Sequence, residues 1–248
     1  MLRLAALLLA LASPSVAEEV VAGLSQSRIS ISTNFDGSEI LIFGAVKREE
    51  AIPDEPLHVL IAVEGPSEPI DVRRKERRFG IWINTDVVEV DQAPSFYAVA
   101  TTAPWDEVLK GTEDLRHRIS IKRAIRSVGA TIPGSGDFTD ALIRIRQNDD
   151  LYQTNIGAVS MASQTLFSTV VQLPANLHEG DYKARFYLTR GGEVLDSYET
   201  QIDVQKVGLE RFLFRLSRDN PLVYGLMSLA IAIAAGWAAS AAFRLFRA

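Results

Sequence analysis

The sequence predicts a mainly β protein: an immunoglobulin-like (Ig-like) antiparallel β-sandwich with an inserted helical hairpin, followed by a single C-terminal transmembrane helix. Short runs of alternating apolar and polar residues recur between prolines and glycines, which is typical of an antiparallel sandwich. Apolar residues at helical intervals interrupt these runs at about residues 112–152. The last apolar run, residues 222–243, contains no charge. As a helix it would be about 33 Å long, enough for the roughly 30 Å hydrocarbon core of a bilayer.

The amino terminus, residues 1–17, has the pattern of a secretory signal peptide. Arg3 supplies a positive charge, residues 4–12 form a short apolar region, and small residues precede a cleavage site after Ala17. We therefore expect the mature chain to begin at Glu18. The alternative is an uncleaved anchor, but the apolar region is too short to span a bilayer.

The exported part, residues 18–207, contains the predicted sandwich. Its strands are expected at residues 28–33, 39–46, 57–63, 79–84, 95–101, 165–173, 181–189 and 193–206. Tyr182, preceded by Gly180 and Asp181 at the head of a strand, resembles the tyrosine corner of Ig-like sandwiches. The alternative organisation is two small domains that meet near residue 104.

The inserted helical hairpin is predicted from capping signals and periodicity. Thr112 is expected to cap a first helix, with acidic residues in its first turn and Gly129 as its stop. A second helix is expected to begin at Asp137, with apolar residues on one face. Two helices with a short link form an αα-hairpin. The pattern is compatible with packing on the sandwich or on the membrane.

The C-terminal part predicts a membrane anchor in three segments. Residues 208–220 form an amphipathic juxtamembrane segment suited to the lipid headgroups. The transmembrane helix, residues 221–243, opens with a proline, and residues 244–248 form a short cytoplasmic tail. Arginine counts on the two sides of the span do not set its orientation, but the signal peptide does. We therefore expect a single-pass protein of the bacterial inner membrane with a large periplasmic domain.

Small residues recur at intervals of four along the predicted span. These helix-packing candidates are Ser228, Ala232, Gly236 and Ser240. Such a stripe allows a second helix to approach closely, so the expected partners are the lipid bilayer and another integral membrane protein. The alternative is chance, because an alanine-rich span produces such stripes without a partner.

Composition and motifs argue against several classes of function. The net charge of −5 disfavours a nucleic-acid partner. Without cysteine, the chain can form neither a disulfide nor a thiolate metal site, and with no glycosylation sequon it fits a bacterial envelope protein. No zinc, phosphate-cradling or serine-hydrolase motif is present. We expect no catalytic residue, no metal and no cofactor.

Basic residues gather at two places in this acidic chain. The densest cluster comprises Arg73, Arg74, Lys75, Arg77 and Arg78. A second group on the first predicted helix comprises Arg116, Arg118, Lys122, Arg123 and Arg126. A solvated edge strand that is protected from pairing explains the first cluster, and docking to anionic lipid or to an acidic partner surface is the functional alternative.

Several segments resemble a family of transmembrane proteins from alphaproteobacteria. They are residues 23–44, 81–84, 94–97, 173–174 and 180–182, together with the closing span. The resemblance covers nearly the whole mature chain, and its motifs are structural in type. The family has no established activity and defines no functional residues. Its members are often encoded near permeases of the sulfite-exporter type, which implies an accessory subunit of such a transporter.

These expectations favour a non-enzymatic, membrane-anchored periplasmic protein that binds a partner, such as a permease. The first alternative is a periplasmic ligand-binding or sensor module. The short tail leaves no room for a signalling domain, which counts against a sensor. The second alternative is an enzyme built from dispersed carboxylates, which a deep polar pocket with clustered acids would favour.

Overall fold

The computed structural model describes residues 18–32, 35–49, 51–127 and 134–246, and gives their side chains except at 209–212, 215 and 241–246. The predicted signal peptide lies outside the described residues. The chain divides into two compact units. The first contains the described residues up to 29 and from 35 to 204, and the second contains residues 30–32 and 205–246.

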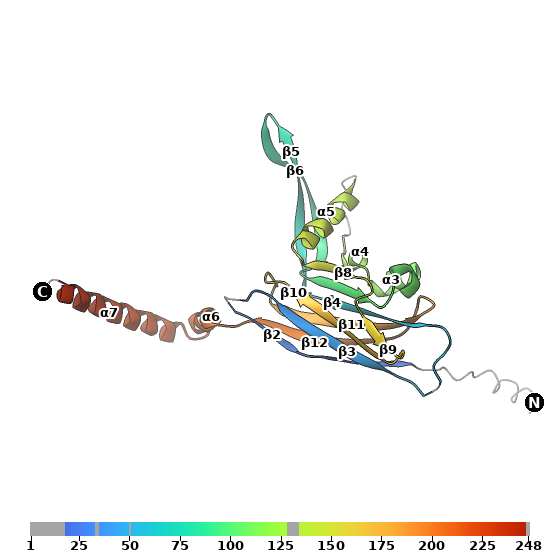
Figure 1. Ribbon diagram of the computed structural model, residues 1–248. Helices are drawn as coiled ribbons and strands as arrows, with labels where there is room; N and C mark the ends of the chain where they lie inside the picture. Colours follow the sequence, from blue (N-terminus) through green and yellow to red (C-terminus); the bar gives the residue numbers. More distant parts are fainter. Residues whose placement is uncertain (1–17, 33–34, 50, 128–133, 247–248) are drawn as a thin grey trace, which may run out of the picture. The chain divides into compact units, whose positions relative to one another are not determined.

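The first unit contains a four-stranded antiparallel sheet in the order β1-β3-β10-β9, of which Figure 1 labels β3, β10 and β9. Its strands are β1 Glu19–Leu24, β3 Ser38–Lys47, β9 Ser160–Ala162 and β10 Leu166–Leu173. On β3, Ile40 and Ile42 are fully buried, and they lie opposite Val171 and Thr169 of β10. Because side chains alternate along a strand, these residues define the inner face of the sheet.

A six-stranded sheet in the order β2-β12-β11-β4-β7-β8 forms the second layer. Its strands are β2 Arg28–Ile31, β4 Leu57–Glu64, β7 Tyr97–Thr101, β8 Tyr152–Asn155, β11 Gly180–Arg190 and β12 Glu193–Lys206. The β7–β8 pair is parallel, whereas the pairs of β4 with β7, β4 with β11, and β11 with β12 are antiparallel. Residues 59–63 of β4 are fully buried, as expected of a central strand.

The two sheets pack face to face through aromatic rings. The Phe167 ring of β10 and the Phe186 ring of β11 have centroids 6.3 Å apart. A Cβ on Gly44 of β3 would lie 2.3 Å from the Phe167 ring, so only glycine fits at this position. The Tyr182 hydroxyl donates to the carbonyl of His178 at 2.8 Å, which is the hydrogen bond of a tyrosine corner. The strand-rich antiparallel fold is confirmed, while the Ig-like topology stays a prediction.

The first helix of the predicted hairpin was expected to run from a cap at Thr112 to a stop at Gly129, but it is divided, and Thr112 lies inside a helix whose N-cap is Lys110. Gly129 lies outside the described residues. In place of the single helix are α3 Gly111–His117 and α4 Ile121–Ala124, preceded by α2 Trp105–Val108. Arg118 ends α3 with a φ of 53°. The Asp114 carboxylate accepts hydrogen bonds from the backbone N–H of Ile119 and of Ser120 at 3.2 and 2.7 Å. These bonds replace the helical ones, because a short acidic side chain competes for nearby backbone donors.

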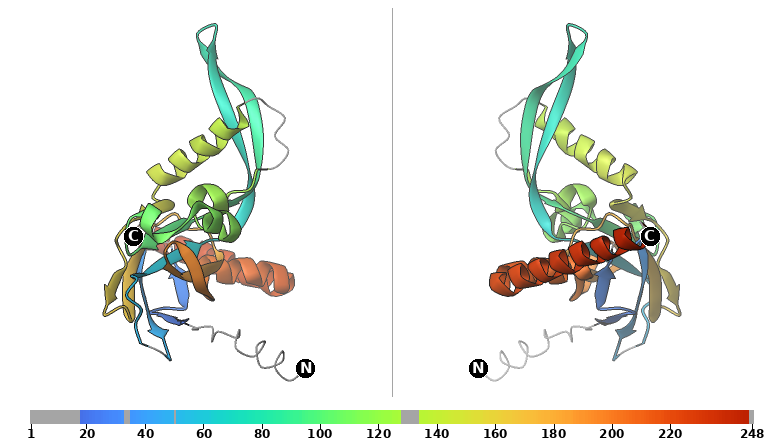
Figure 2. Two further views of the ribbon diagram at one scale, coloured as in Figure 1. Left: turned by 90° about the vertical axis from the view of Figure 1, so that its right-hand side faces the viewer. Right: turned by 90° about the vertical axis from the view of Figure 1, so that its left-hand side faces the viewer.

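The second predicted helix is present as α5 Ser135–Asn148. It lies beside a long antiparallel hairpin of β5 Ser67–Arg78 and β6 Ile81–Pro94, which Figure 2 shows as a twisted ribbon. The guanidinium of Arg74 on β5 lies 4.6 Å from the centroid of the Phe138 ring on α5. The run predicted as a strand from Phe79 begins in a turn, because the last cross-strand pair of the hairpin is Arg78 with Ile81.

The second unit ends in two helices, α6 Leu209–Asp219 and α7 Pro221–Phe246. The predicted amphipathic segment coincides with α6. Of the described helices, one is long and apolar enough to cross a membrane, over Pro221–Ser240 of α7. It begins at a proline, as predicted. Proline is favourable there because the N–H that it lacks would have no hydrogen-bond partner within the helix.

Candidate interaction surfaces

The end of the β5–β6 hairpin, residues 77–82, is exposed and carries three apolar and two basic side chains. We call it the hairpin tip. Its cross-strand pairs are Arg78 with Ile81 and Arg77 with Trp82, which leaves Phe79 and Gly80 as a two-residue turn. The exposed fractions of Phe79, Trp82 and Ile81 are 105 %, 68 % and 64 %. Three large apolar side chains are thus in water at the end of one hairpin.

All five basic docking candidates lie on β5, and the structure gives them different surroundings. Arg74 is within 3.8 Å of Asp86 and 3.9 Å of Asp137, so it joins the hairpin to α5. Arg73 faces Asp71 at 3.6 Å, and Arg78 faces Glu76 at 3.2 Å. Among the described residues, Lys75 and Arg77 have no carboxylate within ion-pair distance. Of the described strands, β5 pairs only with β6, in a two-stranded sheet, so β5 is an edge strand. The interpretation of the basic cluster as protection of an edge strand requires this position.

The second basic group does not share one helix face, because the predicted helix is divided. Arg116 on α3 pairs with Glu113 at 3.0 Å, and Lys122 on α4 pairs with Asp140 of α5 at 2.8 Å. Arg126 lies beyond α4 and forms a β-bridge with Gln92 of β6. The contacts of Lys122 and Arg126 hold the helical segment against α5 and β6, whereas the pair of Arg116 lies within α3.

The outer face of the four-stranded sheet is an apolar surface that sequence reasoning did not identify. Its half-exposed residues are Val21, Leu41, Phe43, Leu166 and Val170. Leu41 lies directly opposite Val170, and Phe43 opposite Gly23, so the side chains form one patch. We call it the outer apolar face. The signal was present in β3, where residues 40–43 are apolar without alternation, a pattern typical of a strand covered on both sides.

The buried carboxylate of Glu18 ties the residue before β1 to β11 and to the residue that follows β3. The Glu18 side chain is 1 % exposed, and it lies between the guanidinium groups of Arg48 and Arg190. Arg48 also donates to the carbonyl of Gln164. Burial alone would raise the pKa of Glu18, but hydrogen bonds and charges from Arg190 and Arg48 lower it below its usual value.

A second buried network is centred on Arg185 of β11. Its guanidinium donates to Glu64 at 2.9 Å, to the Tyr97 hydroxyl at 3.0 Å and to the carbonyl of His117 at 3.2 Å. The Tyr97 hydroxyl donates to the carbonyl of Ile119 at 2.8 Å. Burial raises the pKa of Tyr97, which keeps its proton for this bond. The network fastens the segment after α3 to the six-stranded sheet.

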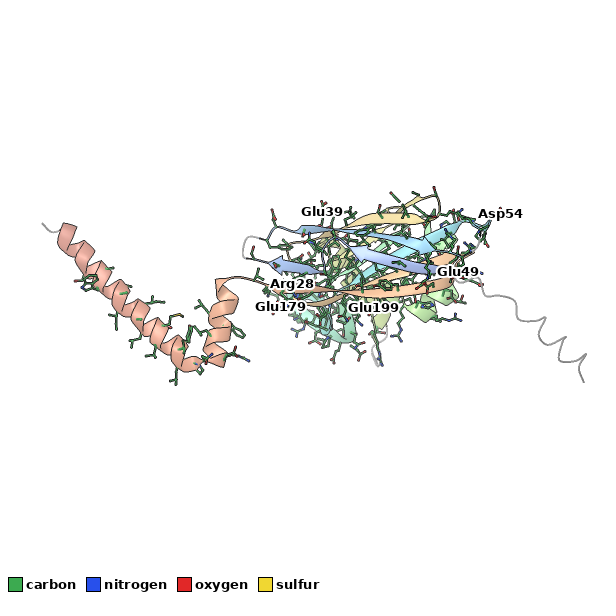
Figure 3. The ribbon with its side chains drawn as sticks, turned by 90° about the horizontal axis from the view of Figure 1, so that it is seen from below. Arg28, Glu39, Glu49, Asp54, Glu179 and Glu199 are labelled. Atoms are coloured by element: carbon green, nitrogen blue, oxygen red, sulfur yellow. The ribbon has the colours of Figure 1, made fainter. Side chains whose placement is uncertain are left out.

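An open polar hollow of about 670 Å³ lies at the start of β3, beside β8 and the end of β10. Its polar lining residues include Asp36, Glu39, Asp150, Gln153, Asn155 and Gln172, and Glu39 is labelled in Figure 3. The Gln172 amide donates to Glu39 at 2.8 Å, and the Gln153 amide donates to the carbonyl of Gln172 at 3.0 Å. In the described part of the chain, no cluster of three or more histidine, aspartate or glutamate residues is arranged to hold a metal ion.

The helix-packing candidates lie on α7, where all four are exposed. A Cβ on Gly236 would meet no atom within 4 Å, so a larger side chain at this position would not clash with the described chain. These candidates lie on the segment that is apolar enough to cross a membrane.

Comparison with known proteins decides the family. A model of the family described as "Putative transmembrane protein (Alph_Pro_TM)" matches residues 19–245. The chain belongs to this family. Together with α7, the match supports membrane anchoring. No curated protein matches the chain.

One solved structure that is similar to the chain is the crystal structure of Spo0M, a sporulation control protein from Bacillus subtilis. It is 10 % identical in sequence, with a TM-score of 0.30. The match covers 82 % of this chain and 55 % of that one, so the chain spans about half the length of Spo0M.

Proposed function

We propose that this family member is a non-enzymatic accessory protein that binds an integral membrane protein in the bacterial inner membrane. The observation that carries the proposal is the outer apolar face. An antiparallel sheet that faces water on one side normally has polar residues there. A contiguous apolar patch with a polar surround is instead typical of an interaction surface.

The membrane helix supports a partner that is itself in the membrane. α7 keeps the chain at a bilayer, and its stripe of small residues offers a second surface to a neighbouring helix. Two weak contacts on one chain reinforce each other, because formation of the first raises the effective concentration of the second. A partner with both a transmembrane helix and an exposed apolar surface outside the bilayer fits this arrangement.

The proposed topology places residues 18–207 in the periplasm and residues 244–248 in the cytoplasm. It depends on the signal peptide predicted from residues 1–17. A permease of the sulfite-exporter type is the partner that the family resemblance suggests, and the proposed role is that of its accessory subunit.

Co-purification tests this proposal. The full chain is isolated from native membranes in mild detergent, and the bound proteins are identified by mass spectrometry. We expect a multi-span permease in an amount comparable to the chain. Recovery of the chain alone, or as an oligomer of itself, would overturn the proposal.

A periplasmic ligand-binding module is the second candidate, and the polar hollow favours it. Its carboxylates and amides could bind a polar ligand, although Gln153 and Gln172 already hydrogen-bond to other groups that line or border the hollow. A calorimetric titration, in which polar small molecules are added to the purified full chain and the heat of binding is measured, distinguishes this candidate. Saturable heat that Glu39→Gln abolishes would support it.

A further inference from the structure

Phe79 occupies a turn position that phenylalanine does not favour. Its φ is 50°, and that of Gly80 is 85°. Two-residue hairpin turns with positive φ at both positions favour asparagine or aspartate followed by glycine. A bulky residue with positive φ is unfavourable, and the complete exposure of Phe79 shows that no packing in the described chain offsets this cost. Strained backbone conformations cluster at functional sites, so the exposed ring of Phe79 is a candidate for a function.

The apolar and basic side chains of the hairpin tip occupy both faces of the strand pair. Successive residues of a strand point to opposite faces, and directly paired residues point to the same one. Arg77 and Trp82 therefore share one face, while Arg78 and Ile81 share the other. A flat protein surface would cover only one face of a hairpin. A lipid leaflet surrounds the end of a hairpin on all sides.

The charges near the tip suit anionic headgroups. Arg77 has no carboxylate within ion-pair distance among the described residues, and the exposed pair of Arg78 with Glu76 is of the kind that contributes little to stability. Arginine can bury its methylene groups while the guanidinium stays at the headgroups, and tryptophan favours the same depth. The basic cluster and the exposed aromatic residues are thus complementary to one environment.

We propose that the hairpin tip inserts into a leaflet that contains anionic phospholipid. Phe79 and Ile81 enter the boundary of the acyl chains, Trp82 lies at the interface, and Arg77 and Arg78 contact the headgroups. Because α7 already holds the chain at a bilayer, the tip needs little affinity of its own. This inference concerns a different surface from the outer apolar face and does not depend on the proposed partner.

Fluorescence of Trp82 in the full chain tests the insertion. The chain has three tryptophans, so Trp105→Phe and Trp237→Phe leave Trp82 alone. The variant is reconstituted into vesicles with brominated acyl chains, made either of phosphatidylcholine alone or with phosphatidylglycerol. We expect a blue-shifted emission and strong quenching with phosphatidylglycerol, and weaker quenching without it. Arg77→Gln and Arg78→Gln should each lower the ratio of inserted to free tip about fivefold.

A second measurement covers the case in which the tryptophan variants misfold. The chain has no cysteine, so Ile81→Cys carries an environment-sensitive dye at a single site. Asp54→Cys, in an exposed loop labelled in Figure 3, is the matched control. A dye at residue 81 that stays as water-exposed as the dye at residue 54 would overturn the proposal. Shielding in native membranes but not in pure lipid would also overturn it, because the occupant would then be a protein.

Discussion

Oε2 of Glu18 lies 2.8 Å from Nη2 of Arg190, in a site where the carboxylate is 1 % exposed. Arg48 completes the site from the other side. The two guanidinium groups compensate for the burial of the carboxylate charge. The arrangement ties Glu18 to Arg190 of β11 and to Arg48, which follows the last residue of β3. Glu18 and Arg190 are 172 positions apart in sequence.

Arg190→Met should therefore destabilise the domain. The carboxylate would keep one partner, Arg48, in a buried site, and we expect a loss of about 2 kcal/mol in the free energy of unfolding. Denaturant unfolding of the full chain in detergent measures it. Arg28→Met is the control, because its pair with Asp203 is exposed, and it should cost less than about 1 kcal/mol. Equal losses in the two variants would contradict this role for Arg190.

The lowered pKa of Glu18 predicts a pH dependence of stability. The folded state binds fewer protons than the unfolded state near the usual pKa of glutamate, about 4.3, so stability rises with pH there. The contribution of Glu18 is present above this pKa and is lost as the pH falls through the lower folded-state value. Thermal unfolding between about pH 6 and 3 should show a steeper loss for the wild type than for Glu18→Gln. Parallel curves would contradict the assignment.

The sequence predicted those elements whose signal is local. The alternating strands and the uncharged run of α7 carry their own periodicity, and the helix α5 was expected within two residues of its observed start. The division of the first helix could not be predicted in the same way. It depends on Asp114, whose carboxylate accepts hydrogen bonds from the N–H groups of the two residues after Arg118. In a longer helix these N–H groups would donate to backbone carbonyls.

The interaction surfaces were only partly predictable, because exposure is a property of the fold. Phe79 begins an apolar run, and only the pairing of Arg78 with Ile81 shows that it occupies a turn. The apolar run in β3 indicates a strand covered on both faces, but it does not show which face lacks a covering layer. The network of Arg185 joins residues from three strands that are far apart in the sequence, so no sequence motif predicts it.

Leu41→Asp should weaken binding of the proposed partner through the outer apolar face. Leu41 is 44 % exposed, so the substitution places a charge where the partner would bury an apolar group. We expect at least a fivefold loss of the partner in co-purification. Leu195→Asp on β12 is a matched control, because Leu195 is 46 % exposed on the other sheet. If both variants recover the same amount of partner, the outer apolar face is not the contact.

Gly236→Ile should weaken the same complex within the membrane. Isoleucine fills the groove that the small residues leave, and it keeps a second helix from approaching closely. The free chain tolerates the change, because a Cβ at this position meets no atom within 4 Å. Ala234→Ile enlarges the opposite side of α7 by helical spacing and serves as the control. Several-fold loss for Gly236→Ile alone is expected, and unchanged recovery would exclude the stripe as a contact.

Protease added to spheroplasts should digest the body and spare the C-terminal tail. The proposed topology has the signal peptide export residues 18–207 and α7 stop the transfer, so we expect nearly the whole chain on the periplasmic face of the membrane. An epitope after Ala248 reports the protected fragment, whose size should correspond to α7 with its short flanks. Detergent is the control, since it should make the tagged tail accessible as well. A body that resists protease in intact spheroplasts would reverse the topology and place the hairpin tip and the outer apolar face in the cytoplasm.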